Sequence, residues 1–150
     1  MNTDKQKLYT IGFAGKSAEE FFSLLKKAGV KILLDIRLNN ISQLAGFTKG
    51  KDLAYFVRAI LDGQYYHMTD LAPTKELLKK YQADEDWQSY KREFLALLEK
   101  RHAETKIKPE LLKGPTVLLC SEKTSEKCHR RLTAEYLHKK LLSDYTIEHL

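Results

Sequence analysis

The side chains best suited to chemistry fall in two segments of the sequence. They are Asp35 and Arg37 in the first segment, and Cys120, Ser121, Glu122, Cys128, His129 and Arg130 in the second. Carboxylates and imidazoles transfer protons, thiolates attack electrophiles, and guanidinium groups bind phosphates and carboxylates. Together these residue types indicate a site that holds an anion and moves protons.

Arg130 is predicted to point into the protein. A helix is expected from about residue 125 to 142, and at 100° per residue one of its faces carries Arg130, Ala134, Leu137 and Leu141. The three apolar residues of this face must lie against the core, so the arginine faces the core as well. An inward arginine needs a carboxylate or an anionic ligand as its partner.

Three partners for Arg130 are open: Asp35, Glu122 and a substrate phosphate. A buried ion pair between Arg130 and Asp35 could be purely structural, because such pairs are retained for the fold as well as for function. Arg37 follows Asp35 by two residues, so both side chains leave a strand on the same face. There Arg37 suits an anion, and Asp35 suits a metal, a general base or the pairing with Arg130.

The cysteines and the histidine each allow two interpretations. Cys120 and Cys128 are either small buried hydrophobic residues or, for Cys128, a thiolate whose pKa is lowered by the helix N-terminus, His129 and Arg130. His129 is either a general base or a solvated residue of the first helical turn. The Cys-x7-Cys-His spacing is not a standard zinc pattern, so no metal site is predicted. A redox disulfide between the two cysteines stays open as an alternative, although the pair lacks the usual Cys-x-x-Cys form.

Two further segments could contact a ligand. The loop from Gly12 to Ser17 looks like the end of a phosphate loop, but two residues separate its glycines where the Walker pattern has four, so no ATPase is predicted. A tight turn before a capped helix explains both glycines, although a single phosphate could sit there. Tyr65, Tyr66 and His67 could stack on bases, but in a strand at least one tyrosine is expected in the core.

Apolar strand-like runs alternate with helical patterns, which predicts parallel strands joined by helical crossovers. Strands are expected at 8–11, 30–36, 64–68, 116–120 and 145–149, and helices at 17–28, 51–62, 74–82, 86–101 and 125–142, with a polar loop over 39–50. Ser17 and Glu20 form a Ser-x-x-Glu capping box at the first helix. The predicted architecture is α/β and Rossmann-like, with three layers and a mostly parallel sheet between helices on both faces.

Ligands of such open sheets bind at the carboxyl ends of the strands. Those ends are predicted at Gly12, at Asp35 to Arg37, at His67 and at Cys120 to Glu122. The residues singled out above for their chemistry therefore lie at the edge of the sheet where a ligand is expected.

Length and composition fit one domain, 1–150, with a core of its own. Two cysteines do not make a disulfide framework, no apolar run approaches the ~20 residues that cross a bilayer, and the first residues lack the apolar core of a signal peptide. A cytoplasmic protein without a membrane segment is expected. The net charge of +6 would attract nucleotides and nucleic acids. The sequence assigns no cofactor and no oligomeric state.

Four motifs carry a resemblance to a known family: Tyr9-Thr-Ile-Gly12, Leu34-Asp-Ile-Arg37, Leu71-Ala-Pro-Thr-Lys-Glu-Leu77, and Leu119-Cys-Ser-Glu122 with Cys128-His-Arg130. From Tyr9 to His149 the chain resembles the DUF488 family, small proteins of unknown function. The resemblance implies an α/β fold in which the Asp-x-Arg and Cys-x-Glu/Cys-His-Arg motifs are close in space, and it supplies no reaction.

The chain departs from this family at two places. Similar proteins tend to have a histidine and a serine where this chain has Phe13 and Ala14, and a proline and a serine after the Asp-x-Arg motif, where it has Asn39, Asn40 and Ser42. If the first pair normally joins the site, the activity of this member is altered.

Two functional hypotheses follow. The first is an enzyme acting on a phosphate-bearing substrate, a nucleotide or nucleic acid, with the anion bound by Arg37, Arg130, Gly12 and Ser121. Protons would be transferred by Asp35, Glu122 or His129, and Cys128 is a secondary candidate for a nucleophile. The second is a non-catalytic module that binds nucleic acid or a protein through its basic face. A pocket reaching Asp35, Cys120, Glu122 and Arg130 would favour the enzyme, and mutual pairing of these groups would favour the module.

Overall fold

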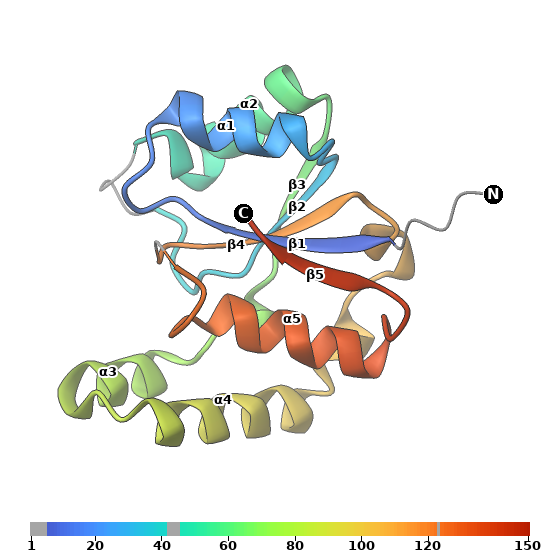
Figure 1. The fold of residues 1–150 in the computed structure, drawn as a ribbon. Helices are drawn as coiled ribbons and strands as arrows, with labels where there is room; N and C mark the ends of the chain where they lie inside the picture. The colour runs from blue at the N-terminus through green and yellow to red at the C-terminus, as the bar shows by residue number, and fades with distance from the viewer. Residues whose placement is uncertain (1–5, 42–45, 123) are drawn as a thin grey trace.

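A five-stranded sheet runs through the middle of the molecule (Figure 1). In this computed structural model, which describes residues 6–41, 46–122 and 124–150, the strands follow the order β3-β2-β4-β1-β5. They are β1 (Lys7–Gly12), β2 (Ile32–Asp35), β3 (Gln64–His67), β4 (Thr116–Cys120) and β5 (Thr146–His149). Every pairing between them is parallel, so the predicted α/β class is confirmed.

Helices cover both faces of the sheet (Figure 1). One face carries α1 (Ala18–Lys27) and α2 (Gly50–Leu61), and the other carries α5 (His129–Lys140), with α3 (Lys75–Asp84) and α4 (Trp87–Arg101) beside it. Short 3-10 turns lie at Gly46–Thr48, Thr69–Leu71, Ala103–Lys106 and Pro109–Leu112. Strands covered on both faces are apolar on both, which explains the continuous apolar runs of β2 and β4.

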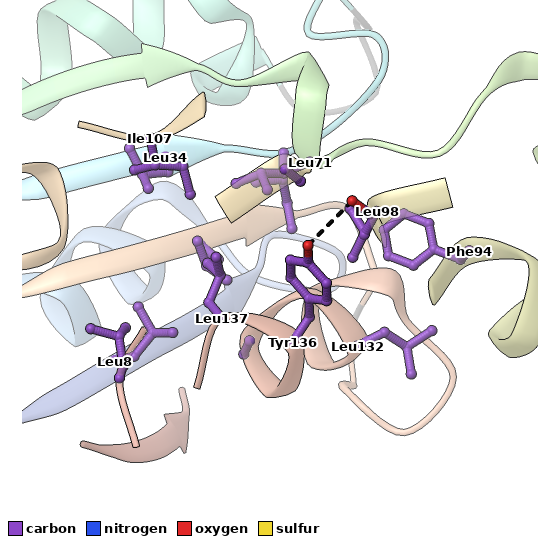
Figure 2. Close-up of a cluster of buried hydrophobic side chains, with 14 of the residues drawn as sticks. Leu8, Leu34, Leu71, Phe94, Leu98, Ile107, Leu132, Tyr136 and Leu137 are labelled. Carbon is purple, nitrogen blue, oxygen red and sulfur yellow. Dashed lines mark hydrogen bonds between the residues drawn. The ribbon is translucent and has the colours of Figure 1, made fainter. Parts of the chain in front are cut away.

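Each face of the sheet has its own core, because successive side chains of a strand point to opposite faces. In β2, Leu33 packs in the core under α1 and α2, and Leu34 packs in the core shared with α4 and α5. Figure 2 shows part of this second core, where Tyr136 of α5 donates a hydrogen bond to the Leu98 carbonyl of α4 (3.2 Å). These contacts fix α5, and with it the residues at its N-terminus.

Most elements begin and end within two residues of the predicted limits. Ser17 is the N-cap of α1, as predicted, and its Oγ accepts a hydrogen bond from the Glu20 amide (3.1 Å). Residues 42–45 of the predicted loop, which include the departure at Ser42, lie outside the described residues. None of the described helices has both the length and the apolar character needed to cross a membrane.

The predicted start of the last helix is wrong. Residues 124–127 form turns, and α5 begins at His129 with Cys128 as its N-cap. The sulfur of Cys128 accepts a hydrogen bond from the Arg130 amide (3.4 Å), which satisfies an amide that the first turn leaves without a partner. Cys128 therefore ends the loop instead of lying within the first helical turn.

The inner face of α5 is shorter than predicted. Arg130, Ala134 and Leu137 are buried as expected, with Arg130 only 1% exposed. Leu141 was expected on the same face but is 47% exposed. The reason is that the helix ends at Lys140, so Leu141 no longer follows the helical spacing that would turn it inward.

Candidate ligand-binding site

A cavity of about 290 Å³ opens at the carboxyl edge of the sheet, beyond the ends of β1, β2 and β4. The predicted site residues that line it are Arg37, Ser121, Glu122, Cys128 and His129. The loop after β2, the loop after β4 and the start of α5 deliver them to one place. This matches the position at which open parallel sheets bind ligands.

The remaining predicted residues, Gly12, Asp35 and Arg130, do not belong to the cavity lining and lie beneath it. Gly12 and Arg130 contact the backbone carbonyl of Glu122, and Asp35 forms an ion pair with Arg37. Cys120 is likewise buried and outside the lining. The expected pocket was to reach Asp35, Cys120, Glu122 and Arg130. Of these four residues only Glu122 lines the cavity, and the other three are buried outside its lining.

Asp35 and Arg37 form a buried two-point ion pair. Arg37 Nε lies 2.8 Å from Asp35 Oδ1, and Arg37 Nη2 lies 2.7 Å from Oδ2. The Tyr65 hydroxyl donates to the same Oδ2 (2.5 Å). Burial alone would lower the pKa of Arg37, but its hydrogen bonds and attraction to Asp35 outweigh that effect and raise the pKa, so the guanidinium stays charged.

Arg37 keeps one nitrogen without a partner. Its Nη2 also donates to the Thr48 carbonyl (2.6 Å), whereas Nη1 is buried and has no hydrogen-bond acceptor among the described residues. The side chain is 5% exposed, and its guanidinium carbon lies 5.4 Å from the centre of the Phe13 ring. A buried guanidinium N–H without an acceptor is costly, and an anion that reached it from the cavity would satisfy it.

The ion pair between Arg130 and Asp35, one of the three pairings that the sequence left open for Arg130, is not formed. Both oxygens of Asp35 are already occupied by Arg37 and Tyr65. Arg130 Nη1 donates instead to the Glu122 carbonyl (2.8 Å) and lies 3.7 Å from the Cys120 sulfur. Arg130 thus holds the backbone of the loop after β4, which carries the Glu122 side chain into the cavity lining.

Gly12 makes room for this arrangement. A Cβ atom at position 12 would lie 1.6 Å from the Glu122 carbonyl oxygen and 2.2 Å from Arg130 Nη1. The end of β1, the loop after β4 and the buried arginine can approach this closely because Gly12 has no side chain. Lys16 Nζ donates to the Gly12 carbonyl (2.9 Å), and Glu19 and Glu20 in the first turn of α1 oppose an anion at that helix end.

The two cysteines share a hydrogen bond, and their pKa values move in opposite directions. The pKa of Cys128 is raised by its hydrogen bond to Cys120 and by burial, which opposes the thiolate interpretation and favours the alternative of a small buried hydrophobic residue. Burial alone would raise the pKa of Cys120, but the hydrogen bond from Cys128 and the charge of Arg130 lower it. The group that favours the thiolate form is therefore Cys120, beneath the cavity.

His129 is partly buried and neutral near pH 7. Its Nε2 donates to the Ile36 carbonyl (2.8 Å), its ring meets the Phe94 ring edge-on, and burial, assisted by the charge of Arg130, lowers its pKa to about 4. With the proton on Nε2, the second nitrogen is an acceptor. His67 Nε2 binds the next carbonyl, that of Arg37 (2.8 Å), so two histidines hold the backbone that carries Arg37.

Acidification should destabilise the protein through His129. Its pKa is about 4 in the folded state against 6.5 for the free side chain, so the unfolded chain binds the proton first as the pH falls. This favours unfolding and should lower the free energy of unfolding by about 2 kcal/mol between pH 7 and pH 5. Urea unfolding at pH 7 and at pH 5 measures this decrease in the free energy of unfolding. In His129→Gln this part of the pH dependence should vanish, and an unchanged slope would contradict the assigned environment.

Tyr65 and Tyr66 are packed against the cores. The Tyr65 hydroxyl accepts a hydrogen bond from the Asn40 side chain (3.0 Å) as well as donating to Asp35, and Tyr66 donates to Gln64. Both rings are partly buried, and each packs against one of the two cores without being fully enclosed in it. Stacking on bases by this pair would require these contacts to break.

Sequence reasoning missed eight lining residues, among them Phe13, Tyr81, Tyr90 and Lys127. Phe13 stands at one departure from the resembled family, and the neighbouring Ala14 amide donates to the Ser121 carbonyl (3.0 Å). Tyr81 and Tyr90 come from α3 and α4, and the helical spacing of Tyr90 indicated only a core position. Among the described residues, no group of three or more metal-binding side chains is brought together.

Comparison with known proteins gives one match. A family model described as "Domain of unknown function DUF488" matches residues 17–137, which include all the lining residues except Phe13. No curated protein and no solved structure matches the chain.

Proposed function

Since the chain belongs to the DUF488 family of unknown function, we propose from the site itself that it is an enzyme acting on a phosphate-bearing substrate. The substrate would occupy the cavity at the carboxyl edge of β1, β2 and β4. The observation that carries this proposal is the buried Arg37 Nη1, which belongs to the lining side chain and has no acceptor among the described residues.

A phosphate suits Arg37 because its oxygens accept charge-assisted hydrogen bonds from guanidinium groups. Asp35 uses the Nε and Nη2 side of the guanidinium and holds it in one orientation, so Nη1 is the donor left for a ligand. Lys127 adds a second positive charge to the lining. Asp35 is accordingly a positioning residue in this proposal, and it does not transfer protons.

Glu122 is the residue proposed to transfer the proton. Its side chain is exposed and lines the cavity, while its backbone carbonyl is fixed by Arg130 Nη1 (2.8 Å). General acid–base catalysis requires a titratable group within hydrogen-bond reach of the substrate, and the Glu122 carboxyl is the acidic group that the cavity lining offers to a bound ligand. The second nitrogen of His129 offers an acceptor that orients the ligand. The raised pKa of Cys128 argues against a nucleophilic role for that thiol.

A non-catalytic binding module is the alternative. The net charge of +6 and the mutual pairing of Asp35 with Arg37 favour it. The two proposals differ in one observable respect, because an enzyme converts a compound that it binds and a module does not.

Replacing Arg37 with lysine should weaken binding of phosphate-bearing compounds about 10- to 100-fold, because one charge-assisted hydrogen bond is lost. The loss of affinity is measured by the thermal shift that ribose 5-phosphate and 5′-mononucleotides produce in each protein. A ligand that binds only the folded state raises the Tm of the protein. Wild type should gain about 5 °C or more at 100 times Kd.

Arg58→Lys is the matched control, because Arg58 is exposed on α2 and outside the lining. If Arg37→Lys proves too unstable to test, Lys127→Gln removes the second charge of the lining without touching a buried pair. The proposal fails if no phosphate-bearing compound shifts the Tm of wild type, or if the shift survives both substitutions.

A further inference from the structure

We infer that the ligand is a single nucleoside monophosphate, with its base against an aromatic wall formed by Phe13, Tyr81 and Tyr90 and its phosphate at Arg37. This inference rests on the proposed function and names the substrate class of the same site. It is argued from the aromatic side chains, the size of the cavity and its charges.

The aromatic wall is built by residues from separate elements. The Tyr81 and Tyr90 rings lie with their centres 4.9 Å apart, and the Trp87 ring stacks on Tyr90 at 5.5 Å with a 22° angle between the planes. Tyr81 is partly buried and Tyr90 is buried. Tyr90 also stacks on Phe94, with ring centres 6.0 Å apart and an 11° angle between the planes, so its buried ring supports Tyr81 from behind. This packing fixes the partly exposed Tyr81 ring before any ligand arrives, and a pre-ordered ring stacks on a base at little entropic cost.

Phe13 joins the aromatic and charged parts of the cavity. It follows β1, lines the cavity and lies 5.4 Å from the guanidinium carbon of Arg37. Leu38, Leu78 and Pro73 extend the apolar part of the lining. A sugar phosphate alone would leave these apolar surfaces in contact with water, whereas a heterocyclic base would cover them.

Cavity size and charge limit the ligand to one nucleotide with one phosphate. A volume of about 290 Å³ is at the lower end for small-molecule pockets. Among the described lining residues, the charges are those of Arg37, Lys127 and Glu122, and Arg37 is already paired with Asp35. A triphosphate would bring several further negative charges, and the described residues of the lining supply no further cation to meet them.

Calorimetric titration of the wild-type protein with adenosine and uridine 5′-monophosphates, ribose 5-phosphate and adenosine tests the inference. At least one mononucleotide should bind about 10-fold or more tightly than ribose 5-phosphate and than the nucleoside. Tyr81→Ala should remove most of the advantage over ribose 5-phosphate, and Tyr81→Phe should keep it. Tyr55→Ala, at an exposed tyrosine of α2 outside the lining, should change nothing.

The outcomes separate the two proposals. If ribose 5-phosphate binds as tightly as both mononucleotides, the base inference is overturned while the proposed function stands. If neither ribose 5-phosphate nor the mononucleotides bind, the proposed function and the base inference are both overturned. A dinucleotide is titrated in the same way. If it binds more than 10-fold more tightly than the mononucleotides, the inference that the ligand is a single nucleotide is overturned. Should Tyr81→Ala fail to fold, the ligand series on wild type still decides, because it needs no substitution.

Discussion

Gly12→Ala should lower the free energy of unfolding by about 3 kcal/mol or more, enough to remove much of the stability of a domain of this size. The added Cβ would lie 1.6 Å from the Glu122 carbonyl oxygen, which is backbone and cannot rotate away. To make room, the loop after β4 must move and Arg130 must lose its bond to that carbonyl. Urea unfolding followed by circular dichroism measures the loss.

Gly46→Ala is the matched control for this substitution. A Cβ atom at position 46 meets no atom of the described residues within 4 Å, and the residue is not in the positive-φ region. Its free energy of unfolding should stay within about 0.5 kcal/mol of wild type. Equal stabilities of the Gly12 and Gly46 variants would mean that β1 and the loop after β4 are not as closely packed as described.

Glu122→Gln should slow turnover of a bound phosphate compound at least about 100-fold, because general acid–base groups contribute 10² or more to rates. Glutamine keeps the size and the backbone bond to Arg130 but cannot exchange a proton at neutral pH. Binding should change little, so the loss should appear in kcat and not in KM. Phosphorus NMR of the compounds that raise the Tm of wild type would follow their conversion.

Glu126→Gln serves as the control, since Glu126 is exposed on the same loop and lies outside the lining. It should leave turnover unchanged. If wild type binds a compound tightly yet converts none of it, the non-catalytic module is favoured. If Glu122→Gln retains full turnover, another group moves the proton.

The fold followed from the sequence because hydrophobic periodicity is a local signal. The apolar runs of β2 and β4 marked buried strands, and Ser17 marked the start of α1. The start of α5 was missed because Ser125 is the commoner kind of N-cap, whereas the structure uses the sulfur of Cys128. A weak acceptor can cap a helix when the chain brings it to the right place, and the sequence alone does not reveal that.

The candidate site was only partly predictable. Its position followed from a rule about the carboxyl ends of parallel strands, and the inward orientation of Arg130 followed from helical spacing. Which arginine would pair with Asp35 depended on geometry, and Arg37 reaches both carboxylate oxygens from the same face of the strand. The places of Tyr81 and Tyr90 depend on how α3 and α4 pack beside α5, which no local pattern encodes.

The central claim is that Arg37 receives the phosphate of the ligand. The most direct test is NMR of the protein labelled with ¹⁵N-arginine, which observes the guanidinium signals while adenosine or uridine 5′-monophosphate is added. The Arg37 signals should shift in a saturable way as Nη1 gains an acceptor, and the Arg58 signals should stay in place. Saturable binding by calorimetry with no change in the Arg37 signals would contradict the claim.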